Sequence, residues 1–483
     1  MIPVPPLPGD DPALDQSIHG LHDTHPELSA SRVLTLPQAF GLGTLLLALG
    51  TGLVLDPVAA GLCLSALVTL LYVCLLLRNL RLFPDLLSPA TGGRRVSDAE
   101  ALAIPVEVLP SYTVMVAAYR EAAVIPRMLA ALDGLDYPRD RLEVLLLLEQ
   151  DDQATRAAVQ SAGPAAYVRV VLVPPGGPRT KPKALNYGLT RARGELVTVY
   201  DAEDRPEPLQ LRRAAFTFAR SDPRVGCLQC TLGYHNPRQN LLTRWFALEY
   251  LTWFGHTLPA VAKGRTPVPL GGTSMHIRRR LLEQVGAWDA HNVTEDADLG
   301  VRLYRLGYRT EVLQSETLEE ANSDPVNWVK QRSRWVKGYA QTWLVHTRHP
   351  WRLWRQLGTR GFVGFNLLVG GTTLASLLNP FMWILTLTWF TFQPPIVQAI
   401  FPGWVFYPAL FSLLCGNFIG WYGGFVAVRG SGRPELLRAA VLMPVYWLLM
   451  SVGAIRAFVQ ITVSPFHWEK TVHGLDLPVQ PTA

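Results

Sequence analysis

The chain has 483 residues, of which 17% are charged, and its formal net charge is +6. Soluble domains carry about 25% charged residues, so the low value indicates that part of the chain lies in a membrane. The positive balance does not predict a nucleic-acid-binding protein, because the arginines cluster beside apolar segments and do not alternate with aromatic residues. Membrane lipid is therefore an expected partner, and nucleic acid is not.

The N-terminal part begins with a polar, proline-rich and mostly acidic leader over residues 1–35. It lacks the basic start of a signal peptide, so we expect it to be flexible or interfacial. Two uncharged runs of 20 residues follow, Leu36–Leu55 and Val58–Leu77. A bilayer crossing takes about 20 apolar residues, so residues 36–77 are predicted to form two transmembrane helices joined at Asp56-Pro57. The alternative is a buried hairpin in a soluble protein.

The middle of the chain, residues 101–345, has the composition and length of one α/β domain. Short apolar runs alternate with helical patterns, which predicts a parallel, doubly wound sheet. The predicted helix after the first strand is Glu121–Leu135. The predicted strands are Tyr112–Ala118, Leu142–Leu148, Val168–Val173 and Leu196–Tyr200.

Polar side chains follow three of these strands directly. In open α/β sheets, ligands bind outside the carboxyl ends of the strands, so the pattern indicates a nucleotide site. A turn or helix cap is the alternative reading for any single one of them. The residues concerned are Tyr119 and Glu121, then Glu149, Asp151 and Asp152, and finally Asp201.

Two polar motifs suit a diphosphate and its metal ion. Asp201-Ala-Glu203-Asp204 follows a strand, and Mg²⁺ and Mn²⁺ take carboxylates together with substrate phosphates. Lys181 and Lys183 precede Asn186 after a proline- and glycine-rich turn, where a lysine neutralises a diphosphate. The plainer alternatives are an acidic helix N-terminus and a solvated basic loop.

Two further motifs open predicted helices. Thr294-Glu295-Asp296 begins a helix that Gly307 ends, and Asp296 is a candidate general base for an acceptor hydroxyl; the alternative is a charge that favours the helix dipole. A helix starting at Asp324-Pro325 places Gln331, Arg334 and Trp335 on one face. That face suits a sugar phosphate, and an amphipathic helix at the membrane surface is the alternative.

An aromatic-rich helical stretch, Asn240–Ala262, lies on the membrane, lines an acceptor path, or forms an ordinary core helix.

The C-terminal part is again apolar. Residues 346–361 are basic and predicted to be interfacial, residues 362–463 to hold transmembrane helices, and residues 464–483 to form a tail. Basic stretches favour the cytoplasm, so the first two spans should cross out and back. The third contains Arg456, which either faces a polar path or snorkels to an interface; a re-entrant helix is the alternative to a full crossing. The apolar runs are Phe362–Phe392, interrupted at Asn379-Pro380, then Trp404–Val428 and Ala440–Thr462.

With these motifs in this order, the chain resembles the membrane-embedded family 2 glycosyltransferases, such as cellulose, chitin and hyaluronan synthases. The resemblance covers about Tyr112–Val345 and the flanking helices. It rests on a D-x-D-like motif at Asp201, the T-E-D at Thr294 and the Q-x-x-R-W at Gln331. It implies a GT-A fold (Rossmann-like, with a mostly parallel sheet) in a cytoplasmic domain, a nucleoside-diphosphate sugar donor, Mg²⁺ or Mn²⁺, and inversion to a β-linkage.

The resemblance also implies residue roles. The catalytic base is Asp296. The acceptor and product contact Glu295, Gln331 and Trp335. The metal ligands are Asp201, Glu203 and Asp204, with the choice between the last two open. The donor-binding residues are Ala118, Tyr119 and Glu121 in the segment Ala117-Ala-Tyr119-Arg-Glu121, together with Glu149 or Asp151, Lys181, Asp201 and Arg334.

Two motifs depart from the family pattern. The second carboxylate of the D-x-D is Glu203, and the acidic group after the second strand is Glu149-Gln-Asp151-Asp152 instead of D-D-G. The C-terminal membrane part is short, and no extension of the kind that binds cyclic di-GMP follows, so control by an attached second-messenger domain is not expected.

The expected function is processive synthesis of a polysaccharide at a bacterial inner or plasma membrane, with UDP-glucose favoured as the donor because it is common in the family. The partners are the donor and a growing glycan or lipid acceptor; export partners stay open. One alternative is a single transfer onto a lipid or lipid-linked acceptor, which product length would distinguish. The other is a non-catalytic nucleotide-sugar-binding membrane subunit, which a fully active Asp296→Asn protein would support.

Overall fold

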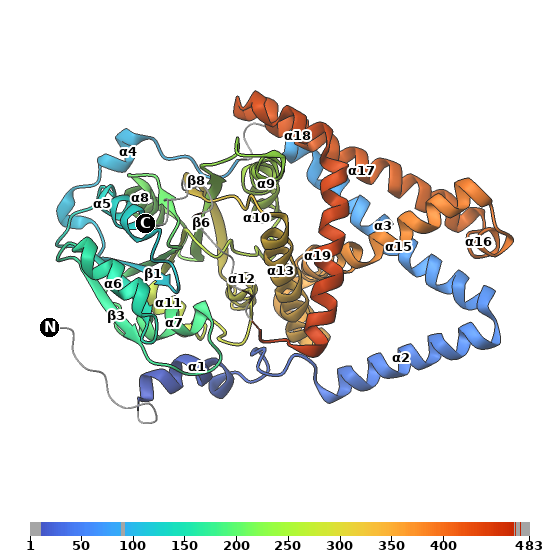
Figure 1. Ribbon diagram of the computed structural model, residues 1–483, viewed down its shortest axis with the longest axis horizontal. Coiled ribbons are helices and arrows are strands. Elements are labelled where there is room, and N and C mark those ends of the chain that lie inside the picture. The colour runs from blue at the N-terminus through green and yellow to red at the C-terminus, as the bar shows by residue number, and fades with distance from the viewer. Residues whose placement is uncertain (1–10, 88–91, 468, 470–473, 475–483) are drawn as a thin grey trace, which may run out of the picture.

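The structure, a computed structural model, describes residues 11–87, 92–467, 469 and 474. A sheet-containing domain lies on one side, and long helices extend from it on the other (Figure 1). The domain is built on a sheet of 8 strands in the order β3-β2-β1-β4-β7-β6-β8-β5.

One half of this sheet is the parallel sheet that the sequence predicts. Its strands are parallel neighbours, and β4 is buried along its whole length, as expected for a strand covered on both faces. The predicted bounds agree with the structure to within one residue. The strands are β1 (Tyr112–Ala118), β2 (Leu142–Glu149), β3 (Val168–Val173) and β4 (Leu196–Tyr200).

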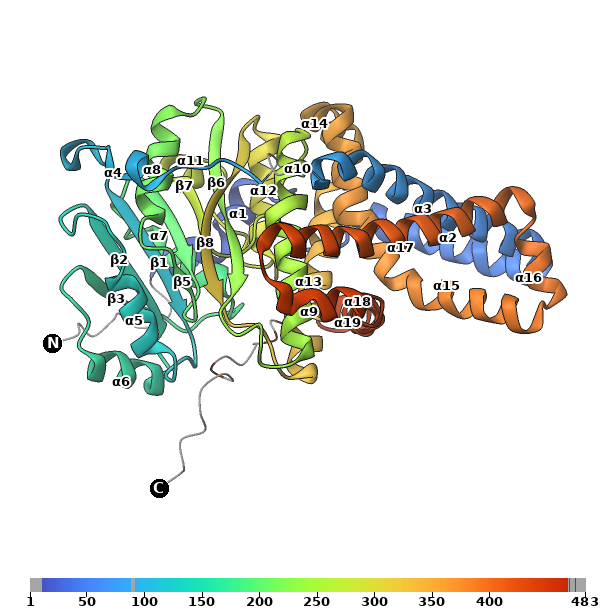
Figure 2. The same cartoon turned by 90° about the horizontal axis from the view of Figure 1, so that it is seen from above.

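The other half is mixed, so the sheet is not parallel throughout. β7 pairs antiparallel with both β4 and β6, while β6 and β8 are parallel and β5 is antiparallel to β8. This half lies beside the helices that lead to the membrane part (Figure 2). Its strands are β5 (Arg205–Pro206), β6 (Val225–Tyr234), β7 (Met275–Arg278) and β8 (Arg309–Glu319).

Helices cover both faces of the sheet with apolar side chains. One core contains residues of α5 (Ile125–Asp133), α6 (Gln153–Ala162) and α8 (Gln210–Arg220). The other contains residues of α7 (Lys181–Leu189), α11 (Arg279–Gln284) and α12 (Glu295–Arg305). The first helix is shorter than the predicted Glu121–Leu135, because the chain turns after β1 with Arg120 at a φ of 56°.

The leader is folded onto the domain in its described part, contrary to the expectation of a flexible or interfacial segment. Helix α1 (Pro12–Thr24) lies against α7, where Asn186 Nδ2 donates to Ser17 O at 2.9 Å. Further along, Ala30 N donates to the buried carboxylate of Asp289 at 2.5 Å. These polar contacts explain why a segment without an apolar run still packs. Residues 1–10 lie outside the described chain.

Five helices of the described chain are long and apolar enough to cross a membrane. The first two, α2 (Leu36–Leu55) and α3 (Pro57–Leu87), are the predicted pair of apolar helices joined at Asp56-Pro57, although α3 extends past Leu77. The next span runs from α14 (Pro350–Phe365) through a π-helical turn at Asn366–Gly371 into α15 (Thr372–Phe392). The helix is continuous through Pro380, so the predicted interruption at Asn379-Pro380 is wrong. Helices α16 (Pro395–Ile400) and α17 (Gly403–Ser431) complete a second hairpin.

The last helix, α19 (Met443–Val463), lies across the ends of α3, α15 and α17 instead of running beside them, as both views show (Figures 1 and 2). It packs along α13 (Pro325–His346) of the domain. The chain after it returns to the domain, where Lys337 Nζ donates to His467 O at 2.7 Å. Residues 464–467 therefore lie on the same side as the domain, and Arg456 pairs with Glu469 at 2.5 Å.

Candidate active site

A cavity of about 570 Å³ begins at the carboxyl ends of β1, β2 and β4 and extends between the domain helices toward the membrane helices. It is bordered by α13, α19 and α9 (Leu241–Thr252), the first helix of the aromatic stretch Asn240–Ala262. Of that stretch, Tyr250, Trp253 and Phe254 line the cavity. One side of this helical stretch therefore forms a wall of the site, while buried side chains such as Trp245 and Phe246 belong to a hydrophobic core.

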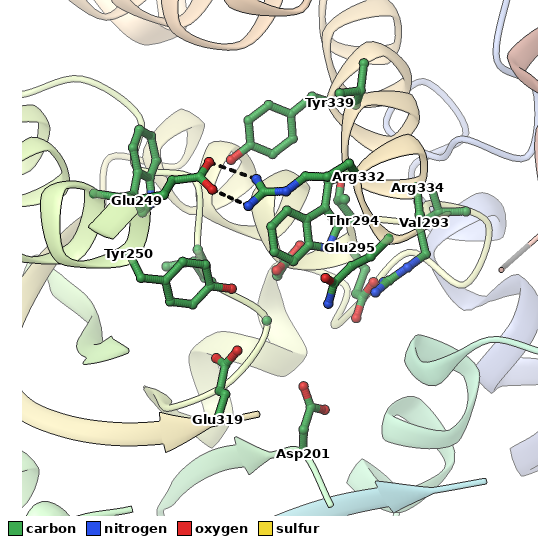
Figure 3. Close-up of a pocket in the computed structure, with 18 of the residues that line it drawn as sticks. Asp201, Glu249, Tyr250, Val293, Thr294, Glu295, Glu319, Arg332, Arg334 and Tyr339 are labelled. Carbon is green, nitrogen blue, oxygen red and sulfur yellow. Dashed lines mark hydrogen bonds and ion pairs between the residues drawn. The ribbon is translucent and has the colours of Figure 1, made fainter. Parts of the chain in front are cut away.

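Most of the predicted site residues lie around this one cavity, although they are far apart in the sequence. Figure 3 shows Asp201 at its floor, with Glu295 and Arg334 on the opposite wall. The predicted residues that line the cavity are Ala118, Tyr119, Glu121, Glu149, Lys181, Asp201, Glu203, Glu295, Asp296, Gln331, Arg334 and Trp335. Asp151 and Asp204 do not line it.

Asp204 is buried behind the cavity and shapes the loop that carries Asp201. Its Oδ2 accepts from Asp201 N at 2.8 Å and from the hydroxyl of Thr273. Burial raises the pKa of the Asp204 carboxyl well above its usual range, and the charges of Asp201 and Glu203 raise it further. The structure thus places Glu203, and not Asp204, on the cavity beside Asp201.

Lys181 holds the carboxylate of Asp201. Its Nζ contacts Asp201 Oδ1 and donates to Gly272 O at 2.9 Å. Burial lowers the pKa of the Lys181 ammonium, but the Asp201 and Glu295 charges outweigh it and the net shift is upward. Lys181 is therefore a charged group at the cavity wall.

Lys183 has a different position from Lys181, although both belong to the same motif. It is fully buried and pairs with Glu149 Oε1 at 2.9 Å. Asp151 lies outside the cavity, where it pairs with Arg179 at 2.9 Å. Lys183 thus holds the Glu149 carboxylate from the buried side, whereas Arg179 places a cation in the cavity lining.

Asp296 and Glu295 are buried carboxyls in the first turn of α12. Burial raises the pKa of Asp296 and of Glu295, and the charge of Asp296 adds to the shift of Glu295. Ala297 N donates to Asp296 Oδ1 at 2.7 Å, while Lys181 and Arg334 oppose the upward shift. Gly272, with a φ of 82°, approaches Asp296 so closely that an added Cβ would lie 2.9 Å from Oδ2. Asp296 is therefore a carboxyl with a raised pKa that lines the cavity.

The predicted helix at Asp324-Pro325 forms as α13, because the Asp324 carboxylate caps it by accepting from Asn327 N at 2.7 Å. Trp335 stacks near Tyr250, with ring centroids 6.4 Å apart. Gln331 Oε1 lies 3.5 Å from the amide of Asn322. The face of α13 that the sequence singled out therefore points into the cavity.

Helix α13 approaches the start of α12 at a glycine. An added Cβ at Gly338 would lie 2.3 Å from Thr294 Oγ1, which is too close for any real Cβ. Thr294 is the N-terminal cap residue of α12, but its side chain makes no capping hydrogen bond. The small residue on α13 thus sets the distance between the two motif helices.

We expect Gly338→Ala to lower the free energy of unfolding by about 1–3 kcal/mol through overpacking, and to reduce activity because α12 and α13 move apart. A helical Gly→Ala change in open space stabilises by about 0.5–1 kcal/mol. Gly430→Ala in α17, where nothing lies within 4 Å of the added Cβ, is the matched control. Thermal unfolding and initial rates of both variants check this, and equal behaviour of the two would contradict it.

Sequence reasoning missed several residues of the cavity wall. Glu249, Glu319, Arg332 and Tyr339 all line it, and Figure 3 shows Glu319 facing the cavity near Asp201. The only signal for Glu249 was a lone carboxylate in an aromatic-rich helix. Arg332 lies between the motif residues Gln331 and Arg334, and no sequence pattern indicated a role for it.

The carboxylates at the floor of the cavity fit a divalent cation shared with a substrate. Within the described ranges, no group of three or more His, Cys, Asp or Glu residues is arranged to hold a metal ion alone. Mg²⁺ and Mn²⁺ are commonly held by one or two carboxylates together with substrate phosphates, and Asp201 and Glu203 supply that number.

A second cavity, of about 450 Å³, lies among α3, α15, α16 and α17. The two cavities adjoin, since Arg78, Thr372, Ser376, Gly420 and Trp447 line both. The second one extends to Val397 of α16 and to Phe401, which follows this helix, at the end of the helices far from the domain (Figure 1).

The sequence of the chain is similar to those of known glycosyltransferases. Residues 110–338 match the family model described as glycosyltransferase like family 2. A probable glycosyltransferase, YdaM of Bacillus subtilis, is 29% identical over 233 residues, which are 48% of this chain and 55% of that protein. The beta-monoglucosyldiacylglycerol synthase of Synechocystis sp. is 28% identical over 381 residues, 76% of this chain and 75% of that protein. The cellulose synthase 1 catalytic subunit of Komagataeibacter xylinus is 24% identical over 242 residues, 49% of this chain and 32% of that protein.

The fold and the clustered motifs agree with a domain similar to the family 2 glycosyltransferases, joined to helices that are apolar enough to cross a membrane. The similarity covers residues 110–338. The chain spans about half the length of the first of the three relatives and a third of the last.

Proposed function

We propose that the chain is an inverting β-glycosyltransferase that adds sugars from a nucleoside diphosphate processively to a polysaccharide at the cytoplasmic face of a membrane. The observation that carries this proposal is the adjoining pair of cavities. One holds the motif residues, and the other continues among the membrane helices to α16.

In the proposed mechanism, Asp296 accepts the proton of an acceptor hydroxyl, whose oxygen attacks the anomeric carbon of the donor in a single displacement. The bond from that carbon to the diphosphate breaks as the new bond forms, which inverts the configuration. Lys181, Arg179 and Arg334 lie on the cavity to neutralise the departing diphosphate. Tyr119 and Glu149 lie at the strand ends where the nucleoside is expected.

A divalent cation, Mg²⁺ or Mn²⁺, would be held by Asp201 and Glu203. When bound, it supplies Lewis-acid stabilisation of the leaving diphosphate. Lys181, which already contacts Asp201, orients this carboxylate toward the cavity.

The lining of the second cavity favours a glycan over a purely apolar chain. It combines aromatic rings such as Trp383 and Trp389 with polar groups such as Asn379. The hydroxyls of Thr69 and Ser412 also line it and are buried without a hydrogen-bond partner within the described ranges. An unpaired buried hydroxyl costs about 1–3 kcal/mol, and a sugar hydroxyl passing through would remove that cost.

A single transfer onto a lipid acceptor is the second candidate. One observation favours it: the lipid glucosyltransferase of Synechocystis aligns with 76% of this chain, whereas the cellulose synthase subunit aligns with 49%. In that case the apolar side chains near the junction of the cavities, such as Leu368, Met443 and Met450, would contact the lipid.

Product size tests the proposal directly. Purified protein in nanodiscs would be incubated with Mn²⁺ or Mg²⁺ and a panel of radiolabelled UDP- and GDP-sugars. We expect one donor to give high-molecular-weight product. A short product that extracts into organic solvent would overturn processive synthesis in favour of the lipid acceptor. A folded protein that turns over none of the donors in the panel would contradict both proposals.

The rate should depend on pH through Asp296. The base acts only when ionised, and burial raises the pKa of this carboxyl above its ordinary value, which is about 3.9. As the pH falls, the rate should therefore decline through a pKa of about 6, at a higher pH than an exposed aspartate would give. A kcat profile between pH 4 and 9 measures this limb, and a limb at the ordinary value would contradict the assignment.

A further inference from the structure

A closed network of hydrogen bonds and ion pairs extends from the cavity wall into the buried interior behind it. Arg332 of α13 donates from Nη1 to Glu249 Oε1 at 2.8 Å, and its Nη2 contacts Glu249 Oε2. The same Nη2 donates to the hydroxyl of Tyr446 at 2.8 Å, and that hydroxyl donates to Glu249 Oε2 at 2.6 Å. Figure 3 shows the pairing of Glu249 with Arg332. We call these three residues the Arg332 junction.

The junction joins three helices that the chain brings together from distant segments. Glu249 belongs to α9, Arg332 to α13 and Tyr446 to α19. Tyr446 is 1% exposed and does not line the cavity. Helix α19 packs closely here, since an added Cβ at Gly453 would lie 3.0 Å from Arg332 Cβ. The junction therefore ties the domain helices to the helix that lies across the membrane bundle.

The guanidinium of Arg332 also supports the aromatic wall. It lies 4.6 Å from the ring centroid of Trp335 and 4.5 Å from that of Phe246. A cation over a ring face is attracted to the ring electrostatically, and more strongly when it is desolvated. Because both ends of the guanidinium are held by Glu249 and Tyr446, its plane is fixed, and the ring of Trp335 is fixed with it.

We propose that Arg332 is a positioning residue, which with Glu249 and Tyr446 holds Trp335 in the orientation that receives the acceptor sugar. This rests on the proposed function in giving Trp335 an acceptor. The junction itself touches neither the donor side nor Asp296. Losing it should therefore impair use of the acceptor, and leave the donor site as it is.

Tyr446→Phe tests this with the removal of a single hydroxyl. The matched control is Tyr407→Phe, because Tyr407 is exposed on α17 and lies outside both cavities. We expect Tyr446→Phe to lower kcat/KM for the acceptor by about tenfold, with the KM for the donor and the slow hydrolysis of donor without acceptor unchanged. Arg332→Lys, which keeps the charge but not the two-pronged contact, should also lower kcat/KM for the acceptor.

Hydrogen–deuterium exchange gives a readout that needs no activity. Amides of α13 around Trp335 should exchange faster in Tyr446→Phe than in wild type or Tyr407→Phe. Equal exchange and equal transfer in all three proteins would overturn the proposal. A lower kcat/KM for the acceptor that is accompanied by a higher KM for the donor would also overturn it. A wild-type protein that transfers no sugar would instead overturn the proposed function. The exchange of the α13 amides in Tyr446→Phe would still show whether the Arg332 junction holds this helix in place.

Discussion

Asp296→Asn should lower kcat by about two to four orders of magnitude, the usual contribution of a general base. The amide keeps the size of the side chain and still accepts the hydrogen bond that Ala297 N donates at 2.7 Å. It cannot accept the proton of an acceptor hydroxyl. Binding of the donor should persist, since Asp201 and Lys181 are unchanged. Initial rates of transfer, with nucleotide binding measured by calorimetry, check both expectations.

Asp298, on the same helix, separates a chemical loss from a structural one. It is fully buried, pairs with Arg302 at 2.7 Å and with His346 at 2.8 Å, and does not line the cavity. Breaking a buried pair from one side costs about 3–5 kcal/mol. Asp298→Asn should therefore lower the unfolding temperature while the folded fraction keeps its kcat. If Asp296→Asn were as active as wild type, the non-catalytic reading of the chain would gain support.

The parallel half of the sheet was predictable because its strands are buried on both faces. Leu142–Leu148 and Leu196–Tyr200 are nearly continuous apolar runs, and the structure places their apolar side chains in the core. The polar residues that follow them were then predicted to meet at one edge, which Glu149 and Asp201 do. The mixed half gave no such signal, because β7 is only 4 residues long and β6 and β8 join the sheet by long-range pairing.

The contacts of the cavity wall could not be predicted from local pattern. Arg332 and Glu249 are 83 residues apart, and neither spacing nor periodicity connects them. The same holds for α19, whose hydropathy is that of the spanning helices. Its direction is set by packing against α13, where Gly453 permits the close approach. Composition identifies an apolar helix, but its neighbours decide whether it spans the bundle or lies across it.

Asp201→Asn should abolish most of the metal dependence of the reaction. The Asp201 side chain is 33% exposed to the cavity, and its partner Lys181 is 13% exposed, so the substitution removes a ligand and also frees a cation. A metal that stabilises a leaving diphosphate contributes several kcal/mol, and each 1.4 kcal/mol is about tenfold in rate. We therefore expect kcat/KM for the donor to fall by about 10²- to 10⁴-fold. Saturating Mn²⁺ should restore little of it.

Variants of two neighbouring carboxyl residues distinguish the loss of a metal ligand from a change in the loop. Glu203→Gln should weaken metal activation less, because Asp201 still anchors the ion, whereas Asp204→Asn should mainly lower the unfolding temperature, because Asp204 holds the loop through Asp201 N and Thr273. Mn²⁺ binding in the presence of UDP, followed by electron paramagnetic resonance, reports the ligand loss without turnover. If Asp201→Asn bound Mn²⁺ as wild type does while Asp204→Asn lost it, the buried carboxylate would be the ligand and the loop would have to rearrange when the donor binds.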